Sequence, residues 1–170
     1  VTNDGWDFIN DEPLSAGDFG DHGTHVAGTI GAETDNGLGV TGAGWDVSIM
    51  PLRVCEQDQC SGSAVLEAVR YATGLLPDKQ PEQTADVINI SLGGPGRSDY
   101  VADVYQRACQ TGALIVSSAG NENSSRLSYP ASYPCVFSVA AVGSTGERAS
   151  YSNFSSEVDV SAPGGSASFS

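Results

Sequence analysis

The stretch with the greatest capacity for chemistry is Gly-Asp-His-Gly-Thr-His-Val-Ala-Gly-Thr-Ile-Gly-Ala, residues 20–32. His22 stands near its start, and the residues from Thr24 onward predict a short helix. Gly28 and Gly31 each cost such a helix about 1 kcal/mol relative to alanine, so they indicate a second backbone packed against it. An imidazole held by a rigid element can act as a general base, because it takes up and returns a proton near neutral pH.

A histidine beside a glycine also has an ordinary interpretation as a cap or surface residue, and this stretch alone does not decide between the two. His25 lies one helical turn further on and is expected to pack or cap. A metal site built from both is not favoured, because the sequence has 2 histidines in all and no His-Glu-x-x-His pattern.

Length and charge restrict the class of protein. The 170 residues are 39% hydrophobic and predict one domain with a sizeable core. Seven basic against 21 acidic residues give a net charge of −14, which favours solubility and argues against nucleic acid or an anionic membrane as a partner. We find neither a signal peptide nor an apolar run of membrane-spanning length.

The four cysteines form an even set. We predict the disulfides Cys55–Cys60 and Cys109–Cys135, although four cysteines allow three connectivities and the sequence does not choose among them. Paired cysteines indicate an oxidising compartment. Free buried thiols remain the alternative, and a zinc site is not favoured because neither histidine lies at ligand spacing from a cysteine pair.

Apolar segments alternate along the chain in a way that predicts an α/β fold with a parallel sheet and right-handed crossovers. A strand-like piece at residues 6–9 comes first. Strands are expected at 47–54, 86–92, 113–117 and 136–142, and helices at 63–73 and 100–111, the second closed by Gly112. Residues 37–42 fit the Gly-x-Gly-x-x-Gly nucleotide pattern, but they follow a helix and precede a strand, so the pattern is rejected as a phosphate-binding loop, and a nucleotide-binding domain is kept only as a third alternative.

Three further blocks accompany the histidine stretch. They are Asn-Ile-Ser-Leu-Gly-Gly at 89–94, Ser-Ser-Ala-Gly-Asn-Glu at 117–122 and Ser-Ala-Pro-Gly at 161–164. Together with His-Gly-Thr-His-Val-Ala-Gly from His22, they resemble the motifs of the subtilisin-like serine proteases, the subtilases, in that family's order. The resemblance implies a doubly wound, mostly parallel sheet with helices on both faces, incomplete at both ends, so that residues 1–170 are the central portion of one peptidase domain.

The resemblance also implies roles for single residues. His22 matches the general base, and Asn121 matches the asparagine that donates to the oxyanion. Glu122 would lie at the pocket rim and weakly favour a basic side chain, and residues 60–62 would offer a second pairing edge. The primary specificity pocket would be formed by two short segments, which are Ser91, Leu92 and Gly93, and Ser118, Ala119 and Gly120.

A calcium site is implied by the likeness to proteinase K-like members. The carbonyls of Pro134 and Val136 and the carboxylate of Asp159 match its ligands, and such hard oxygen ligands suit calcium, although a site with one carboxylate could hold sodium or stay empty. A cis peptide bond is expected before Pro130. The loop around Asn36 resembles part of a second calcium loop.

The triad aspartate and serine of the family are expected outside this chain. The whole protein would then be a secreted, extracellular serine endopeptidase acting on peptide or protein substrates through a Ser-His-Asp acyl-enzyme mechanism, and this chain alone would be inactive. The missing N- and C-terminal segments are potential partners as separate chains. A non-catalytic peptide-binding relative or an inactive fragment is the alternative.

Overall fold

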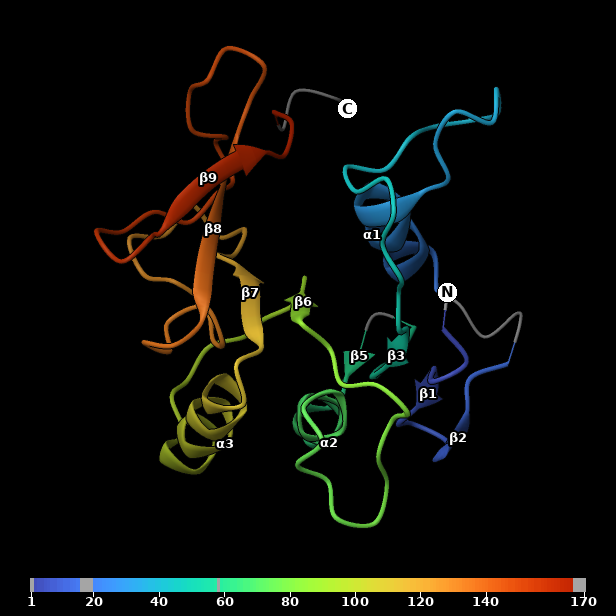
Figure 1. The fold of residues 1–170 in the computed structure, drawn as a ribbon. Coiled ribbons are helices and arrows are strands. Elements are labelled where there is room, and N and C mark those ends of the chain that lie inside the picture. The colour runs from blue at the N-terminus through green and yellow to red at the C-terminus, as the bar shows by residue number, and fades with distance from the viewer. Residues whose placement is uncertain (1, 16–19, 58, 167–170) are drawn as a thin grey trace. The chain divides into compact units, whose positions relative to one another are not determined.

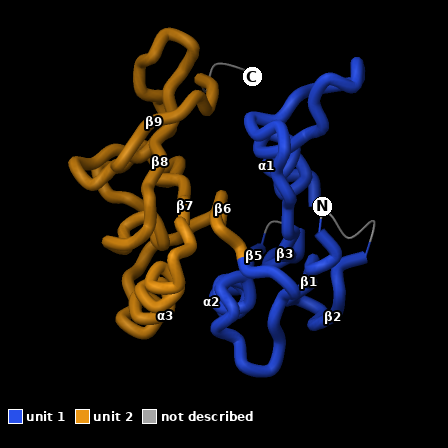
Figure 2. The backbone as a smooth tube through the Cα atoms, in the orientation of Figure 1, with its two compact units in different colours: residues 1–84 blue, residues 85–170 orange. Residues whose placement is uncertain are grey.

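The computed structural model describes residues 2–15, 20–57 and 59–166 (Figure 1). The chain divides into two compact units, residues 1–84 and residues 85–170 (Figure 2). Each unit has strands and helices of its own, and each is described by itself. Among the described residues, no helix has both the length and the hydropathy needed to cross a membrane.

The first unit contains short strands and two helices. A three-stranded sheet has the order β2-β1-β3, in which β1 runs antiparallel to β2 and parallel to β3, and β4 pairs with β5 as an antiparallel hairpin. The elements are β1 (Trp6–Asp7), β2 (Glu12–Pro13), α1 (Asp21–Gly31), β3 (Leu52–Arg53), β4 (Cys55–Glu56), β5 (Gln59–Cys60) and α2 (Gly62–Ala72).

The core of the first unit forms between β1 and α2. Ser61 caps α2 by accepting a hydrogen bond from the backbone N–H of Ala64, which satisfies one of the free donors at a helix start. The ring of Tyr71, on α2, packs edge-on against Phe8 at a centroid distance of 5.7 Å. Tyr71 also donates its hydroxyl to the Asp4 carbonyl at 3.1 Å, so α2 is tied to the segment before β1.

A buried ion pair joins β1 to β3. The Asp7 carboxylate is 0% exposed and accepts a hydrogen bond from Arg53 at 2.6 Å. Burial raises the pKa of Asp7, but hydrogen bonds from Asn10, Ile9 and Arg53 outweigh it and hold that pKa below its ordinary value. The ionised carboxylate is therefore the stabilising form.

Replacing Asp7 with asparagine is expected to lower the free energy of unfolding by about 3 kcal/mol near neutral pH, because Arg53 loses its charged partner. A folded pKa below the ordinary value means that this stabilisation is present above about pH 4 and is lost as the pH falls further. Urea denaturation of both proteins as a function of pH should show the difference shrinking in acid. A difference that does not change with pH would contradict the prediction.

The second unit is built on a four-stranded sheet of order β6-β7-β8-β9 in which all neighbours are parallel. This confirms the predicted α/β class with a mostly parallel sheet. Gly112 has φ +99 just after the helix, as its predicted place at the helix end requires. The elements are β6 (Val87–Ile90), α3 (Asp99–Gln110), β7 (Leu114–Ser118), β8 (Phe137–Val142) and β9 (Val160–Pro163).

The two faces of this sheet differ in exposure. One face is exposed: on it, the apolar side chains of Val87, Leu114 and Val160 are 57%, 47% and 42% exposed. Parallel sheets are normally covered on both faces, so this apolar face is one on which a further layer would pack. The buried face is formed by alternate residues of neighbouring strands, which are Ile88, Ile90, Ile115, Ser117, Ser138 and Ala140.

Several predictions differ from the structure in detail. The strand predicted over 47–54 is reduced to β3, since the preceding Pro51 offers only its carbonyl, which accepts from Trp6. No periodic pattern in the sequence predicts the strands β2, β4, β5 and β9. Both predicted disulfides, Cys55–Cys60 and Cys109–Cys135, are present, and no cysteine of the described residues is free.

Candidate active site

His22 lies in the first turn of α1. The helix begins after Gly20, whose extended backbone lets its carbonyl accept from the Thr24 N–H at 3.1 Å, and Asp21 places a negative charge where the helix dipole favours one. The His22 side chain is exposed and, among the described residues, has no hydrogen-bond partner. A ring in this position is open to a substrate or to another residue.

A second backbone does pack against the C-terminal end of α1, at Gly31 but not at Gly28. The backbone N–H groups of residues 42–44 donate to the carbonyls of residues 32, 29 and 30 at 2.8–3.1 Å. A Cβ on Gly42 would lie 2.6 Å from the Gly31 Cα, so the glycines allow this approach. No described atom outside α1 lies within 4 Å of a Cβ on Gly28, so the expectation is not met at that residue within the described part of the chain.

Asn121 follows the C-terminal end of β7, where ligands bind in parallel sheets. Gly120 has φ +110 and turns the chain there. The Asn121 N–H donates to the Glu122 carboxylate at 3.1 Å, while the exposed side-chain amide has no hydrogen-bond partner within the described part of the chain. Because its backbone is fixed by a hydrogen bond and its side-chain N–H groups are free, this amide can donate hydrogen bonds to an anion.

The two predicted pocket segments are joined through one turn. Gly94 and Tyr129 exchange two backbone hydrogen bonds of 3.0 and 2.9 Å, and the Ser128 N–H donates to the Ala119 carbonyl at 2.9 Å. A Cβ on Gly93 would lie 2.9 Å from the Tyr129 carbonyl oxygen, so only glycine fits there. The structure thus brings Ser91, Leu92 and Gly93 near Ser118, Ala119 and Gly120, and the Tyr129–Pro130 bond is cis, as predicted.

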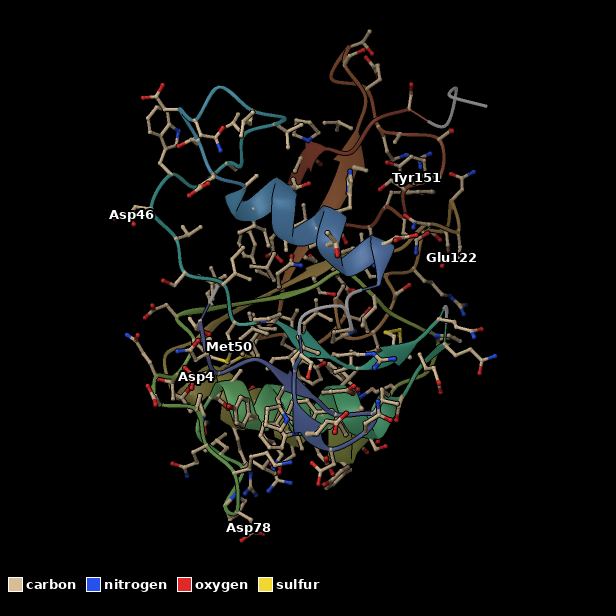
Figure 3. The ribbon with its side chains drawn as sticks, turned by 90° about the vertical axis from the view of Figure 1, so that its right-hand side faces the viewer. Asp4, Asp46, Met50, Asp78, Glu122 and Tyr151 are labelled. Atoms are coloured by element: carbon tan, nitrogen blue, oxygen red, sulfur yellow. A yellow bond between two sulfur atoms is a disulfide. The ribbon has the colours of Figure 1, made fainter. Side chains whose placement is uncertain are left out.

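The Glu122 carboxylate is turned onto its own loop. One oxygen, Oε2, accepts from the Asn121 N–H at 3.1 Å, from the Asn153 amide at 2.5 Å and from the Ser128 hydroxyl at 3.4 Å. Figure 3 labels Glu122 and Tyr151 on adjoining segments, and the Tyr151 carbonyl accepts from the N–H of residue 123. The preference for a basic substrate side chain stays a prediction.

Sequence reasoning missed Asn153. Its side chain is 1% exposed and is hydrogen-bonded to the loop that carries Asn121. Its place in Tyr-Ser-Asn-Phe carries no periodic or spacing signal, because the contact joins residues about thirty positions apart.

The predicted calcium ligands lie at the start of β8 and before β9. The Asp159 carboxylate accepts from both the N–H and the hydroxyl of Ser138, at 2.7 and 2.8 Å, through the same oxygen, Oδ2. Its other oxygen, and the carbonyls of Pro134 and Val136, accept no hydrogen bond from any described residue. Such oxygens are of the chemical type that a hard cation takes as ligands, although nowhere in residues 2–15, 20–57 and 59–166 do three His, Cys, Asp or Glu side chains form a metal-binding group.

Comparison with known proteins identifies the family. A profile of the Subtilase family matches residues 1–170. The chain belongs to the subtilase family. Its relatives include an extracellular protease of Xanthomonas campestris, 42% identical over 149 residues, and subtilisin amylosacchariticus of Bacillus subtilis, 37% identical over 165 residues.

Solved subtilase structures agree with this assignment. Proteases from Pseudoalteromonas arctica match with a TM-score of 0.80 and 38% identity, over 85% of this chain and 44% of theirs. A cold-adapted subtilisin-like serine proteinase matches with a TM-score of 0.77 and 32% identity, over 94% of this chain and 54% of its own. The fold is therefore subtilisin-like.

The subtilase chain described here matches only part of its relatives' length. The alignment with the Xanthomonas protein includes 85% of this chain and 26% of that protein. The alignment with the Bacillus subtilisin includes 94% of this chain and 41% of that protein. His22 belongs to the first unit and Asn121 to the second. The activity of the whole protein is accordingly a proposal.

Proposed function

We propose that this subtilase sequence belongs to a secreted serine endopeptidase that hydrolyses extended protein substrates. The observation that carries the proposal is the Asn121 loop, in which a held backbone presents a free amide beside the paired pocket segments. Such a preorganised donor is the device that stabilises a developing oxyanion. Its place after the end of β7 is where a parallel sheet binds ligands.

His22 acts as the general base in this proposal. It takes the proton from a serine hydroxyl as that oxygen attacks the substrate carbonyl, and the Asn121 amide donates to the oxyanion that forms. The C–N bond then breaks, and His22 returns the proton to the leaving amine. Water releases the acyl group by the reverse sequence of proton transfers. The serine and the aspartate that orients His22 are supplied by residues outside this sequence.

The substrate side chain preceding the cleaved bond would enter between the segments of residues 91–93 and 118–120. Small residues keep this space open, and exposed backbone can pair with an extended peptide. The name of the Xanthomonas relative, an extracellular protease, and the two disulfides support secretion.

The test is a denaturing intact mass of the whole protein, purified with any co-purifying chain, after exposure to a phosphonylating reagent that marks activated serines. A labelled species that contains, or co-purifies with, this chain supports the endopeptidase. An unlabelled protein that still binds peptides favours the non-catalytic relative, and an unlabelled protein without peptide binding favours an inactive fragment. Either of these results would overturn the proposal.

Calcium is proposed as a structural ion held by the carbonyls of Pro134 and Val136 and by the Asp159 carboxylate. An ion there would stabilise the fold by tying the start of β8 to the segment before β9. It supplies charge neutralisation and rigidity when bound, and no chemistry of the reaction.

Adding calcium at 100 times its Kd is expected to raise the stability by about 2.7 kcal/mol, because the ion binds only the folded state. Asp159→Asn should abolish this gain, while its oxygen can still accept from Ser138. Thermal midpoints with and without calcium measure the effect, and Glu157→Gln, an exposed carboxylate two residues away, is the control. An undiminished gain in Asp159→Asn, or an equal gain from sodium, would contradict the calcium site.

A further inference from the structure

Asn153 is a fully buried amide whose hydrogen bonds all lead to the loop of residues 119–124. Its Oδ1 accepts from the N–H groups of Glu122 and Ser124, at 3.0 and 2.9 Å. Its Nδ2 donates to the Ala119 carbonyl at 3.0 Å and to the Glu122 carboxylate at 2.5 Å. Its own backbone N–H donates to the Gly120 carbonyl at 2.9 Å. One side chain thus engages both ends of the loop that carries Asn121.

This arrangement requires an amide. The side chain must accept two hydrogen bonds at one end and donate two at the other, and only asparagine or glutamine has that set of atoms. Aspartate would place an acceptor against the Ala119 carbonyl and against the Glu122 carboxylate. Alanine would leave buried N–H and C=O groups unpaired.

The chain of contacts continues to Asn121. The Glu122 oxygen that accepts from Asn153 also accepts from the Asn121 N–H. Gly120 completes the fit, because a Cβ at that residue would lie within van der Waals overlap of the Asn153 amide nitrogen. Asn153 therefore constrains the backbone on both sides of Asn121 without contacting the free Asn121 amide.

We propose that Asn153 is a positioning residue for Asn121, acting through the Glu122 carboxylate and the backbone of residues 119–124. The proposal rests on the proposed peptidase function and deepens it. The charge of Glu122 is committed to holding the loop, and the placement of the Asn121 amide depends on a side chain from a segment about thirty residues further along the chain.

The central variant is Asn153→Asp in the whole protein. Because a misplacement of about 1 Å can cost about 10²-fold in rate, kcat is expected to fall by about that factor. KM should hardly change, because the donor acts mainly in the transition state. Two carboxylates in contact cannot both ionise easily. The kcat of this variant relative to the parent should therefore rise in mild acid, where a shared proton restores one donor.

The rescue is Asn153→Asp combined with Glu122→Gln, which exchanges the carboxylate and the amide. The glutamine can donate to the new carboxylate and still accept from the Asn121 N–H. Coupling of contacting residues of this kind is expected to raise kcat about tenfold above the single variant. The guanidinium of Arg148 donates to the carbonyls of Ala149 and Ser152 in the segment that carries Asn153, and it is present in every variant.

Asn123→Asp is the matched control, because it makes the same chemical change at an exposed residue of the same loop whose side chain has no hydrogen bond among the described residues. It should leave kcat near the parental value. Amide hydrogen exchange at Glu122 and Ser124 gives a readout that does not require activity, and it should accelerate in Asn153→Asp and not in Asn123→Asp. The exchange measurement can also be made if the parent is inactive. Inactivity of the parent would refute the proposed peptidase function but not the role of Asn153 in holding the loop.

Three results would overturn the positioning role. The first is an active parent whose Asn153→Asp variant keeps its kcat. The second is a loss of kcat with unchanged pH dependence and no rescue by Glu122→Gln. The third is exchange at Glu122 and Ser124 that is the same in parent and variant.

Discussion

Replacing His22 with alanine in the whole protein is expected to lower kcat by about 10⁶-fold, the magnitude that loss of the triad histidine has in a subtilisin. The reason is that the variant would lack the general base that, in the proposed mechanism, takes the proton of the nucleophile and returns it to the leaving amine. His22 lies in the first turn of a helix fixed at its other end by the backbone of residues 42–44, so the change removes a ring without disturbing the helix. Steady-state kinetics on a chromogenic peptide, with active sites counted by phosphonylation of the parent, measure the loss.

His25→Ala is the control for that result. His25 is on the same helix and is also exposed. The Thr29 hydroxyl donates to the His25 backbone carbonyl, which alanine retains. It should lower kcat by less than about tenfold, because it touches no reacting atom. Similar losses in the two variants would show that the helix, and not the His22 imidazole, carries the effect.

The fold could be predicted where the apolar pattern extends over several residues. β6, β7, β8, α2 and α3 all lie within one or two residues of their expected bounds, because their burial follows the period of a strand or a helix. Two-residue strands such as β2 and β5 show no period, since their pairing depends on partners brought together by the tertiary fold. β9 reads Val-Ser-Ala-Pro, with all four residues exposed, and offers no hydrophobic signal.

The candidate site likewise contains residues that local sequence motifs predict and residues that depend on long-range contacts. Local motifs predict His22, Asn121 and the two pocket segments as candidate site residues, because each is a short contiguous block. The turn that joins the pocket segments and the amide of Asn153 depend on long-range hydrogen bonds, and an isolated asparagine reads only as a polar residue. The inward orientation of Glu122 could not be predicted either, since a residue after a Gly-Asn turn is normally solvated.

Replacing Asn121 with alanine is expected to lower kcat by about 10²–10³-fold, which is the effect of removing the same donor in a subtilisin. The side-chain amide is free in this structure, so its loss breaks no described hydrogen bond and should leave the stability near that of the parent. KM should remain close to the parental value, because in the proposed mechanism the amide donates to the oxyanion and not to the ground-state peptide. Steady-state kinetics and thermal denaturation of the same preparations measure both.

Two comparisons make that prediction specific to the oxyanion. A peptide aldehyde, whose tetrahedral hemiacetal adduct places its oxygen where the oxyanion forms, should bind the Asn121→Ala variant more weakly than the parent, while binding of the uncleaved product peptide should not change. Asn123→Gly is the control, because residue 123 has φ +48, which glycine adopts without strain. If aldehyde binding is unaffected while kcat falls, Asn121 would act by holding the loop and not by donating to the oxyanion.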